Sequence, residues 1–141
     1  MYIPAEKWIL MFLLDTNVII AYFKGSHVVK ERILSNIEEI AVSTLVIAEL
    51  YYGAKSSQYP GKNLENLSRF IDIIHVIPFD LSCAIKFGDI KSKLRAIGKP
   101  TGEVDALIGG TAMTHDAVLV TNNLKHFENI EGLKMENWLA K

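Results

Sequence analysis

Short runs of apolar residues alternate along this chain with longer segments in which apolar residues recur every three or four positions. Residues 11–14 and 117–120 carry no charge, which is typical of strands buried on both faces of a parallel sheet. Segments such as 80–96 instead gather their apolar residues on one face of a helix. Strands that alternate with helices predict an α/β fold, a three-layer α/β/α domain with a central, mainly parallel sheet. The predicted strands are 11–15, 40–42, 75–77, 117–121 and 133–135.

Small polar residues mark the predicted helix starts. Asn17 is expected to cap the first helix and Ser26 the second. Ser43 or Thr44 caps a third helix, which gives way to a loop rich in serine, proline and glycine over residues 56–61. Further helices are predicted at 64–74, 80–97, 103–115 and 122–127.

The composition fits one folded domain. The chain has 141 residues, of which 50% are hydrophobic and 22% charged, enough to build a sizeable core. Its net charge of −1 argues against broad, non-specific neutralisation of nucleic-acid phosphates, although an acidic site would hide local positive charge in the sum. The single cysteine, Cys83, excludes an internal disulfide and a zinc site built from several cysteines.

The apolar stretch 8–23 raises the question of a membrane span. Asp15, Thr16 and Asn17 interrupt it, which argues against a spanning helix, and no small-residue cleavage site follows it as in a secretory signal. We therefore expect a cytoplasmic protein with no membrane contact. Residues 1–10 are interpreted as an N-terminal extension or a mis-assigned start, and residues 11–141 as the folded domain.

Four oxygen-bearing side chains stand among apolar or small neighbours, where a simple core would prefer neither a charge nor an amide: Asp15, Glu49, Asp105 and Asn123. Asp15 and Asn123 directly follow predicted strands, and ligands bind beyond the carboxyl ends of strands in such sheets. Oxygen ligands brought together at one edge of a sheet suit a hard divalent cation. The pattern therefore points to phosphodiester chemistry.

Each of these positions also has a structural interpretation. Asp15 is either a metal ligand or the cap of the helix that follows, and capping by Asn17 would leave it free. Glu49 has Val46 and Gly53 among its helical neighbours, so it lies on a stripe of apolar or small residues. An unpaired carboxylate there is costly, which favours a cation, whereas a position at the edge of the stripe would reach water.

Asp105 falls, together with Glu103, in the first turn of a helix, where the helix dipole favours acids. Glycine next to Asp105 in space would let a metal approach it, whereas Glu103 is expected to be peripheral. Asn123 is either a neutral oxygen ligand or a helix cap. Thr121 is either an ordinary strand residue or a hydrogen-bond donor to a carboxylate.

No other arrangement of residues points to chemistry. The histidines are scattered without the spacing of a zinc site, and the pair Gly109-Gly110 inside a helix is expected to serve packing. Basic residues on and after the helix that precedes Asp105 form either a solvated face or a rim that guides phosphates. They are Lys86, Lys91, Lys93, Arg95 and Lys99.

Together these positions resemble those of PIN-domain ribonucleases of the VapC toxin type, over nearly all of residues 11–138. The similarity lies in four blocks taken in order, and the tail 132–138 is also similar. The blocks are 13–20 with Asp15, 43–53 with Glu49, 98–108 with Asp105, and 119–127 with Asn123. Many family members carry aspartate where this chain has Asn123, and the amide would weaken or relocate a second metal site without abolishing the first.

The resemblance implies a metal-dependent endoribonuclease that uses Mg²⁺ or Mn²⁺ and acts as the toxin of a toxin–antitoxin pair by blocking translation. Asp15, Glu49 and Asp105 would anchor the metal directly or through water, and Asn123 would orient a ligand or a water. The resemblance also implies a homodimer and a VapB-type antitoxin that occludes the groove. The RNA that is cut, the number of metal ions and the identity of the antitoxin stay open.

Two other interpretations stay open as well. The first is a PIN scaffold that binds RNA or a protein partner without cutting, which Asn123 favours. The second is a phosphoacceptor or phosphatase of another α/β class, which also places an aspartate after its first strand. The haloacid-dehalogenase arrangement needs a second aspartate where Asn17 stands, and a receiver domain needs paired acids and a lysine that Lys125 matches poorly.

Overall fold

The protein is described by a computed structural model that covers residues 11–139, so the predicted extension 1–10 lies outside the described residues. Its strands form one five-stranded sheet, parallel throughout, in the order β3-β2-β1-β4-β5. The strands are β1 (Phe12–Leu14), β2 (Ile40–Ser43), β3 (His75–Ile77), β4 (Val118–Val120) and β5 (Lys134–Glu136). The helices are α1 (Thr16–Phe23), α2 (His27–Ser35), the 3₁₀ turn η2 (Ile37–Glu39), α3 (Thr44–Lys55), α4 (Pro60–Ile73), α5 (Leu81–Ala96), α6 (Glu103–Thr114) and α7 (Leu124–Phe127).

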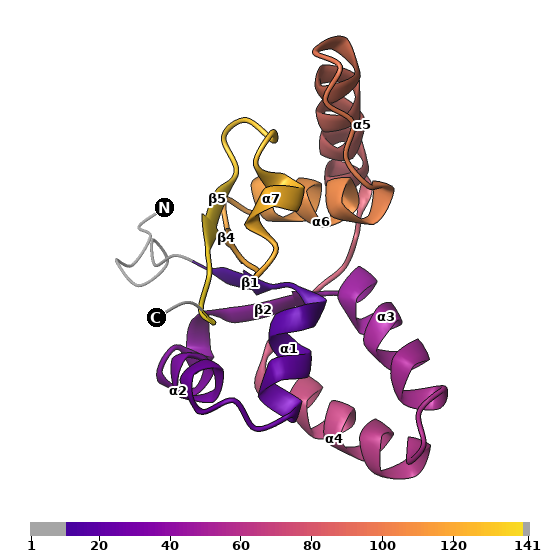
Figure 1. The fold of residues 1–141 in the computed structure, drawn as a ribbon, viewed down its shortest axis with the longest axis vertical. Helices are drawn as coiled ribbons and strands as arrows, with labels where there is room; N and C mark the ends of the chain where they lie inside the picture. Colours follow the sequence, from indigo (N-terminus) through magenta and orange to yellow (C-terminus); the bar gives the residue numbers. More distant parts are fainter. Residues whose placement is uncertain (1–10, 140–141) are drawn as a thin grey trace, which may run out of the picture.

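Helices cover both faces of this sheet, which confirms the predicted α/β/α architecture. Figure 1 shows α1 and α4 on one side of β1 and β2, and α6 with the projecting α5 on the other. The strand order reverses at β1, whose neighbours are β2 on one side and β4 on the other. In open α/β sheets such a reversal leaves a crevice at the carboxyl ends of the strands. The residues that follow β1 and β4 therefore meet at one point.

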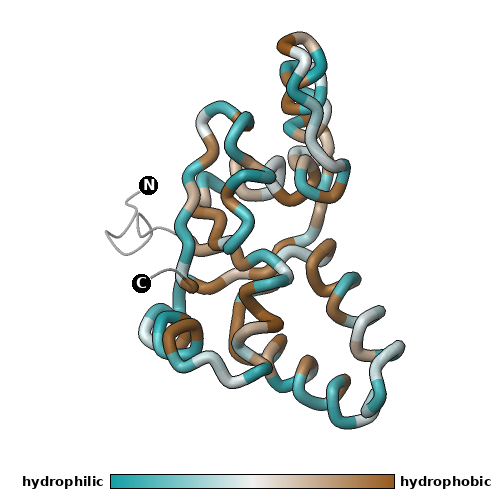
Figure 2. The backbone as a smooth tube through the Cα atoms, viewed as in Figure 1, coloured by the Kyte–Doolittle hydropathy of each residue, from teal (hydrophilic) through white to brown (hydrophobic). Residues whose placement is uncertain are grey.

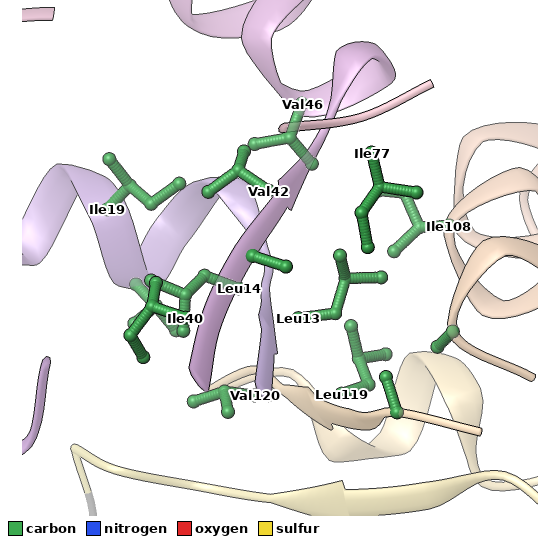
Figure 3. Close-up of a cluster of buried hydrophobic side chains, with 14 of the residues drawn as sticks. Leu13, Leu14, Ile19, Ile40, Val42, Val46, Ile77, Ile108, Leu119 and Val120 are labelled. Atoms are coloured by element: carbon green, nitrogen blue, oxygen red, sulfur yellow. The ribbon is translucent and has the colours of Figure 1, made fainter. Parts of the chain in front are cut away.

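The core lies on both faces because alternate residues of a strand point in opposite directions. Figure 3 shows Leu14 beside Ile19 and Ile40 on the α1 side, and Leu13 beside Leu119 on the α6 side. All five of these side chains are fully buried. Figure 2 shows the same arrangement in the hydropathy of the backbone, which is brown through the central strands and α1 and mixed with teal along α4 and α5. None of the helices formed by residues 11–139 is long and apolar enough to cross a bilayer.

The predicted strands and helices are present, with boundaries shifted by a few residues. The cap of α1 was assigned wrongly, because Asp15 and not Asn17 occupies the N-cap position and accepts the backbone N–H of Thr16 at 2.8 Å. Ser43 rather than Thr44 caps α3. The predicted loop over 56–61 is shorter than expected, since α4 already begins at Pro60, and proline fits the first position of a helix.

Trp138 packs the segment that follows β5 against the sheet. Its side chain is 1% exposed, and its ring packs edge-on against Phe12 with 5.1 Å between the ring centroids. The guanidinium of Arg32 lies over the same ring at 5.0 Å from its centroid, and the indole N–H donates to Glu136 at 2.9 Å. These contacts join β5 and the residues after it to β1 and α2.

Two glycines let α6 approach its neighbours closely, as the sequence predicted. A Cβ atom added at Gly110 would lie 3.2 Å from the backbone nitrogen of Phe87 in α5, and one added at Gly109 would lie 3.0 Å from Ile130. Gly88, in the middle of α5, has no atom within 4 Å of the same position. The contact between α5 and α6 thus depends on a missing side chain at Gly110.

This difference predicts opposite effects of alanine at two helical glycines. Gly88→Ala should stabilise the protein by about 0.5–1 kcal/mol, because alanine restricts the unfolded chain and meets nothing in the fold. Gly110→Ala should destabilise it by about 1–3 kcal/mol, because the neighbour that must move is the backbone of another helix. Urea denaturation measures both free energies, and a stabilising Gly110→Ala would contradict the packing argument.

Candidate functional site

The end of β1 and the end of β4 are joined by a buried hydrogen bond. Asp15 follows β1 directly, and its backbone N–H donates to the carbonyl of Val120 at 2.9 Å. The hydroxyl of Thr121, which follows β4, donates to Asp15 Oδ2 at 2.8 Å. Thr121 is fully buried and Asp15 is 7% exposed. Of the two interpretations of Thr121, the structure therefore confirms a donor to a carboxylate.

The carboxylate of Asp15 is held at both oxygens. Oδ1 accepts the N–H of Thr16 at the start of α1, and Oδ2 also faces the side-chain amide of Asn17 at 3.4 Å. The Oδ1 atom of Asn17 in turn accepts the N–H of Asn122 at 3.4 Å, which links α1 to the turn after β4. Capping of α1 uses only Oδ1 of Asp15, whereas Oδ2 faces Thr121 and Asn17. Asp15 can therefore cap the helix and also take part in a site. Sequence analysis missed the part played by Asn17 and Asn122.

Glu49 reaches the same edge from α3. The hydroxyl of Thr16 donates to its Oε1 at 3.3 Å. Partial desolvation raises the pKa of Glu49, the hydrogen bond from Thr16 lowers it, and the negative charges of Asp15 and Asp105 raise it further. Glu49 is nevertheless exposed to solvent, so of its two interpretations the structure shows the position at the edge of the stripe, which reaches water. The buried face of α3 is formed instead by Val46, Leu50 and Ala54.

Asp105 approaches from the first turn of α6, with 27% of its side chain exposed. Partial desolvation raises the pKa of Asp105, the nearby imidazole of His126 lowers it, and the charge of Asp15 raises it. The distance between His126 Nδ1 and Asp105 Oδ2 is 3.7 Å. A Cβ atom at Gly102 would lie 3.2 Å from Asp105 Oδ2, so glycine keeps the approach to this carboxylate open.

The structure thus brings Asp15, Glu49 and Asp105 into one electrostatic neighbourhood, although they are separated by long stretches of sequence. Among residues 11–139, no three or more histidine, cysteine, aspartate or glutamate side chains stand close enough together to coordinate one ion as they are placed. The donors are all oxygens, and their charges repel one another. This donor set fits a hard divalent cation that keeps part of its water shell, so that some carboxylates act through water.

Asn123 lies next to Thr121, but its side chain forms no hydrogen bond with the three carboxylates. The residue occupies the N-cap position of α7, where its backbone N–H donates to the Thr121 hydroxyl at 3.0 Å. Its side chain makes no capping hydrogen bond and is exposed. The interpretation of Asn123 as a side-chain cap was therefore wrong, and its amide remains available to a ligand.

The other charged residues near Asp105 are arranged differently from the predicted rim. Glu103 is 79% exposed and faces Lys91 at 4.0 Å, which agrees with a peripheral position. Lys86 and Lys93 line a separate cavity of about 270 Å³ against the end of α6. The lysine that lines the space next to Asp105 is instead Lys125 on α7, whose spacing in the sequence gave no signal.

We call the group formed by Asp15, Glu49 and Asp105 the acidic edge. Two hollows begin at this edge, one at Glu49 and the other at Asp105. A groove of about 430 Å³ between α1, α3 and α4 begins at Thr16 and Glu49 and continues over apolar side chains. A cavity of about 340 Å³ begins at Asp105 and is bounded by the loop before α6 and by α7. Within the groove the apolar lining consists of Ile20, Phe23, Leu50, Gly53, Ala54 and Leu67.

Comparison with known proteins matches residues 12–133 to the model of the PIN domain. The chain belongs to the PIN-domain family. Within that family it is a VapC-type protein, because it is 37% identical over 130 residues to the tRNA(fMet)-specific endonuclease VapC of Shigella flexneri. It is also 36% identical over 131 residues to Ribonuclease VapC2 of Haemophilus influenzae. These alignments cover 92% of this chain and 98% and 99% of the two relatives.

Solved structures of VapC-type PIN proteins have the same fold. The DNA-bound VapBC complex of Salmonella typhimurium contains a chain that superposes with a TM-score of 0.87 at 37% identity, covering 92% of this chain and 99% of the other. VapBC2 of Rickettsia felis, bound to a promoter DNA fragment, gives a TM-score of 0.85 at 32% identity, covering 92% of this chain and 99% of that one. The family assignment excludes the haloacid-dehalogenase and receiver alternatives.

Without a divalent cation, the acidic edge should make stability depend on pH. A raised folded-state pKa means that the stabilising contribution of Glu49 is complete below its unfolded-state pKa and is lost as the pH rises through its folded-state pKa. Glu49→Gln removes this loss. In EDTA, the variant should therefore gain stability relative to the unmodified protein as the pH rises above about 4, the unfolded-state pKa of a glutamate, as measured by urea denaturation.

Glu31→Gln is the matched control, because Glu31 is an exposed glutamate on α2, away from the acidic edge. It should follow the pH dependence of the unmodified protein. If Glu49→Gln and Glu31→Gln behave alike, the desolvation and charge repulsion of Glu49 at the edge are not the cause.

Proposed function

We propose that this chain is a metal-dependent endoribonuclease that acts as the toxin of a VapBC toxin–antitoxin pair. One observation carries the proposal: three carboxylates from different helices and strands share the crevice where the strand order reverses, and two of them have raised pKa values. The VapC-type relatives, which are named ribonucleases and endonucleases, support this assignment. The substrate is RNA, and cleavage in the cytoplasm would block translation.

The PIN-domain family implies a divalent cation, and the oxygen-only donor set described above fits one. We assign Asp15, Glu49 and Asp105 to hold it, directly or through water, and favour Mg²⁺ or Mn²⁺. When bound, the cation would lower the pKa of a water molecule and neutralise charge that develops on the phosphate. Asn123 would orient the substrate or a water through its free side-chain amide.

The residues around Asp15 keep its carboxylate in place during this chemistry. The hydroxyl of Thr121 and the N–H of Thr16 fix both oxygens, so the side chain is already ordered before substrate arrives. Thr16 also holds Glu49, because its hydroxyl donates to that carboxylate. Glu49 and Asp105 are more accessible than Asp15, since both are more open to solvent.

The first substrate to test is tRNA(fMet). Two relatives, from Shigella flexneri and Salmonella typhimurium, are named tRNA(fMet)-specific endonucleases and are 37% and 38% identical to this chain. Identity at this level over 92% of the chain supports the same substrate class.

The partner is a VapB-type antitoxin, as in the VapBC structures of the relatives. The apolar groove between α1, α3 and α4 suits an apolar segment of such a partner, and it begins at Glu49. A segment bound there would cover one side of the acidic edge and occlude it. We also propose a homodimer, for which Leu81 and Ile85 on α5 offer apolar surface at 76% and 59% exposure.

The competing function is a PIN scaffold that binds RNA or a partner without cutting it. Asn123 favours this alternative, because an amide carries no charge to hold a second cation. A metal-binding test separates the two, since a scaffold without metal chemistry has no need to bind Mg²⁺ or Mn²⁺.

Asp15→Asn should reduce the rate of tRNA(fMet) cleavage in Mg²⁺ or Mn²⁺ by about 100-fold or more, because the central carboxylate loses its charge. EDTA should abolish the activity of the unmodified protein in the same gel assay of the antitoxin-free enzyme. Asp89→Asn, at an exposed aspartate on α5, should retain full activity. Metal-dependent cleavage that persists in Asp15→Asn would contradict the assignment of the site.

Ile20→Gln should weaken binding of the VapB-type antitoxin by about tenfold or more, because it places an amide in the apolar groove. Val28→Gln is the matched control on α2, outside the groove. The two side chains are similarly exposed in the free protein, at 40% for Ile20 and 43% for Val28. Titration calorimetry measures both affinities, and equal losses would place the antitoxin elsewhere.

A further inference from the structure

A polar cavity lies on the side of Asp105 that faces away from the apolar groove. It has a volume of about 340 Å³ and is open to solvent between α7 and the loop before α6. Its lining residues are Pro100, Thr101, Gly102, Asp105, Lys125, His126, Asn129 and Ile130. The cavity therefore shares one carboxylate with the acidic edge but has a different chemical character from the groove.

Two cationic or hydrogen-bonding side chains enter this cavity from α7. Lys125 is exposed and forms no salt bridge or hydrogen bond with any residue in the range 11–139. His126 has 59% of its side chain exposed and lies 3.7 Å from Asp105, too far for a hydrogen bond. Lys125 is thus free to bind a ligand, whereas His126 is held only by its long contact with Asp105, and both stand beside a proposed metal anchor.

The short helix that carries them is fixed in position. Its Phe127 is fully buried in the core, and its first residue follows the turn held by the hydroxyl of Thr121. The hydroxyl of Thr101 donates to the backbone carbonyl of His126 at 2.9 Å, which ties the loop before α6 to α7. The placement of Lys125 and His126 relative to Asp105 is therefore set by the fold.

A phosphate is the ligand that this cavity suits. An ammonium group and an imidazole N–H both donate to phosphate oxygens, and the lining is more polar than that of the apolar groove. An RNA strand carries one phosphate per nucleotide, so a strand bound at the acidic edge also brings the phosphates on either side of the one that is cut. A strand whose scissile phosphate lies over Asp15 and Asp105 extends its neighbouring phosphate beyond Asp105, into the cavity.

We infer that Lys125 and His126 form a subsite for the RNA backbone phosphate next to the one that is cut. The inference rests on the proposed nuclease function, and it adds residues outside the four acidic and amide positions. Lys125 supplies charge and affinity, whereas His126 supplies a directional hydrogen bond that fixes the register of the strand. Because the contact is to the backbone, it acts on every RNA sequence alike.

The test measures RNA binding in the cleavage-deficient Asp15→Asn background, with labelled tRNA(fMet) and a short mixed-sequence single-stranded RNA as probes. Adding Lys125→Gln should weaken binding of both probes by about five- to tenfold and reduce the slope of log affinity against log salt by about 0.7, the value for one phosphate contact on a single strand. Lys125→Arg should restore both quantities. Lys30→Gln, an exposed lysine on α2, is the matched control and should change neither.

In the Asp15-intact enzyme, Lys125→Gln should raise KM for tRNA(fMet) by a similar factor and leave kcat within about twofold, because the residue binds substrate away from the reacting atoms. His126→Gln keeps a donor and should retain more affinity than His126→Ala. These readouts separate a phosphate contact from a general loss of structure.

The subsite is overturned if the unmodified enzyme cuts RNA in an EDTA-sensitive manner while Lys125→Gln keeps the salt slope of Lys30→Gln. It is also overturned if Lys125→Gln weakens only the antitoxin complex, which would assign the cavity to the protein partner. If the unmodified protein neither cuts nor binds RNA with Mg²⁺ or Mn²⁺, the proposed function itself fails and the subsite fails with it.

Discussion

The buried carboxylate of Asp15 is the feature on which both the fold and the site depend. A charge that is 7% exposed destabilises a protein unless its oxygens are hydrogen-bonded. Here Thr16 and Thr121 satisfy them, one at the start of α1 and the other after β4. The same side chain therefore begins the first helix, joins the two strands at which the sheet order reverses, and forms the centre of the acidic edge. Stability and the proposed chemistry therefore share the hydrogen bonds of one side chain.

Repulsion between like charges sets the second constraint. Glu49 and Asp105 come from helices α3 and α6, and each has its pKa raised by burial and by the charge of Asp15. Within residues 11–139 these side chains do not converge to the distances of direct ligands. A hydrated divalent cation relieves the repulsion without requiring them to do so. Bound as proposed, such a cation would stabilise the folded protein as well as the reaction, because it binds an arrangement that the unfolded chain lacks.

The sequence predicted most of the architecture because uncharged apolar runs leave few alternatives to buried parallel strands. It also predicted that Asp15 and Asn123 lie at one edge of the sheet, since residues that follow neighbouring parallel strands share that edge. Glu49 and Asp105 directly follow no strand, and their nearness to Asp15 comes from the placement of α3 and α6. The prediction failed where side-chain direction decides. The sequence left open whether Glu49 is desolvated or reaches water at the edge of its stripe, because the buried face of α3 runs through the neighbouring positions Val46, Leu50 and Ala54. Lys125 gave no signal, because its place beside Asp105 arises from the bond between Thr101 and α7, a contact between segments 25 residues apart.

The acidic edge separates two surfaces of opposite character, and this separation explains how one small domain meets two partners. The groove that starts at Glu49 is apolar and suits a protein segment. The cavity that starts at Asp105 is polar, carries Lys125 and suits a nucleic-acid backbone. A partner in the groove reaches Glu49 without entering the cavity, yet a strand of RNA must cross the carboxylates that join the two. Under the proposed function, inhibition then requires only that the partner cover Glu49 and Thr16. The cationic cavity can keep its affinity for phosphate, because an RNA held there has no access to a complete set of metal anchors.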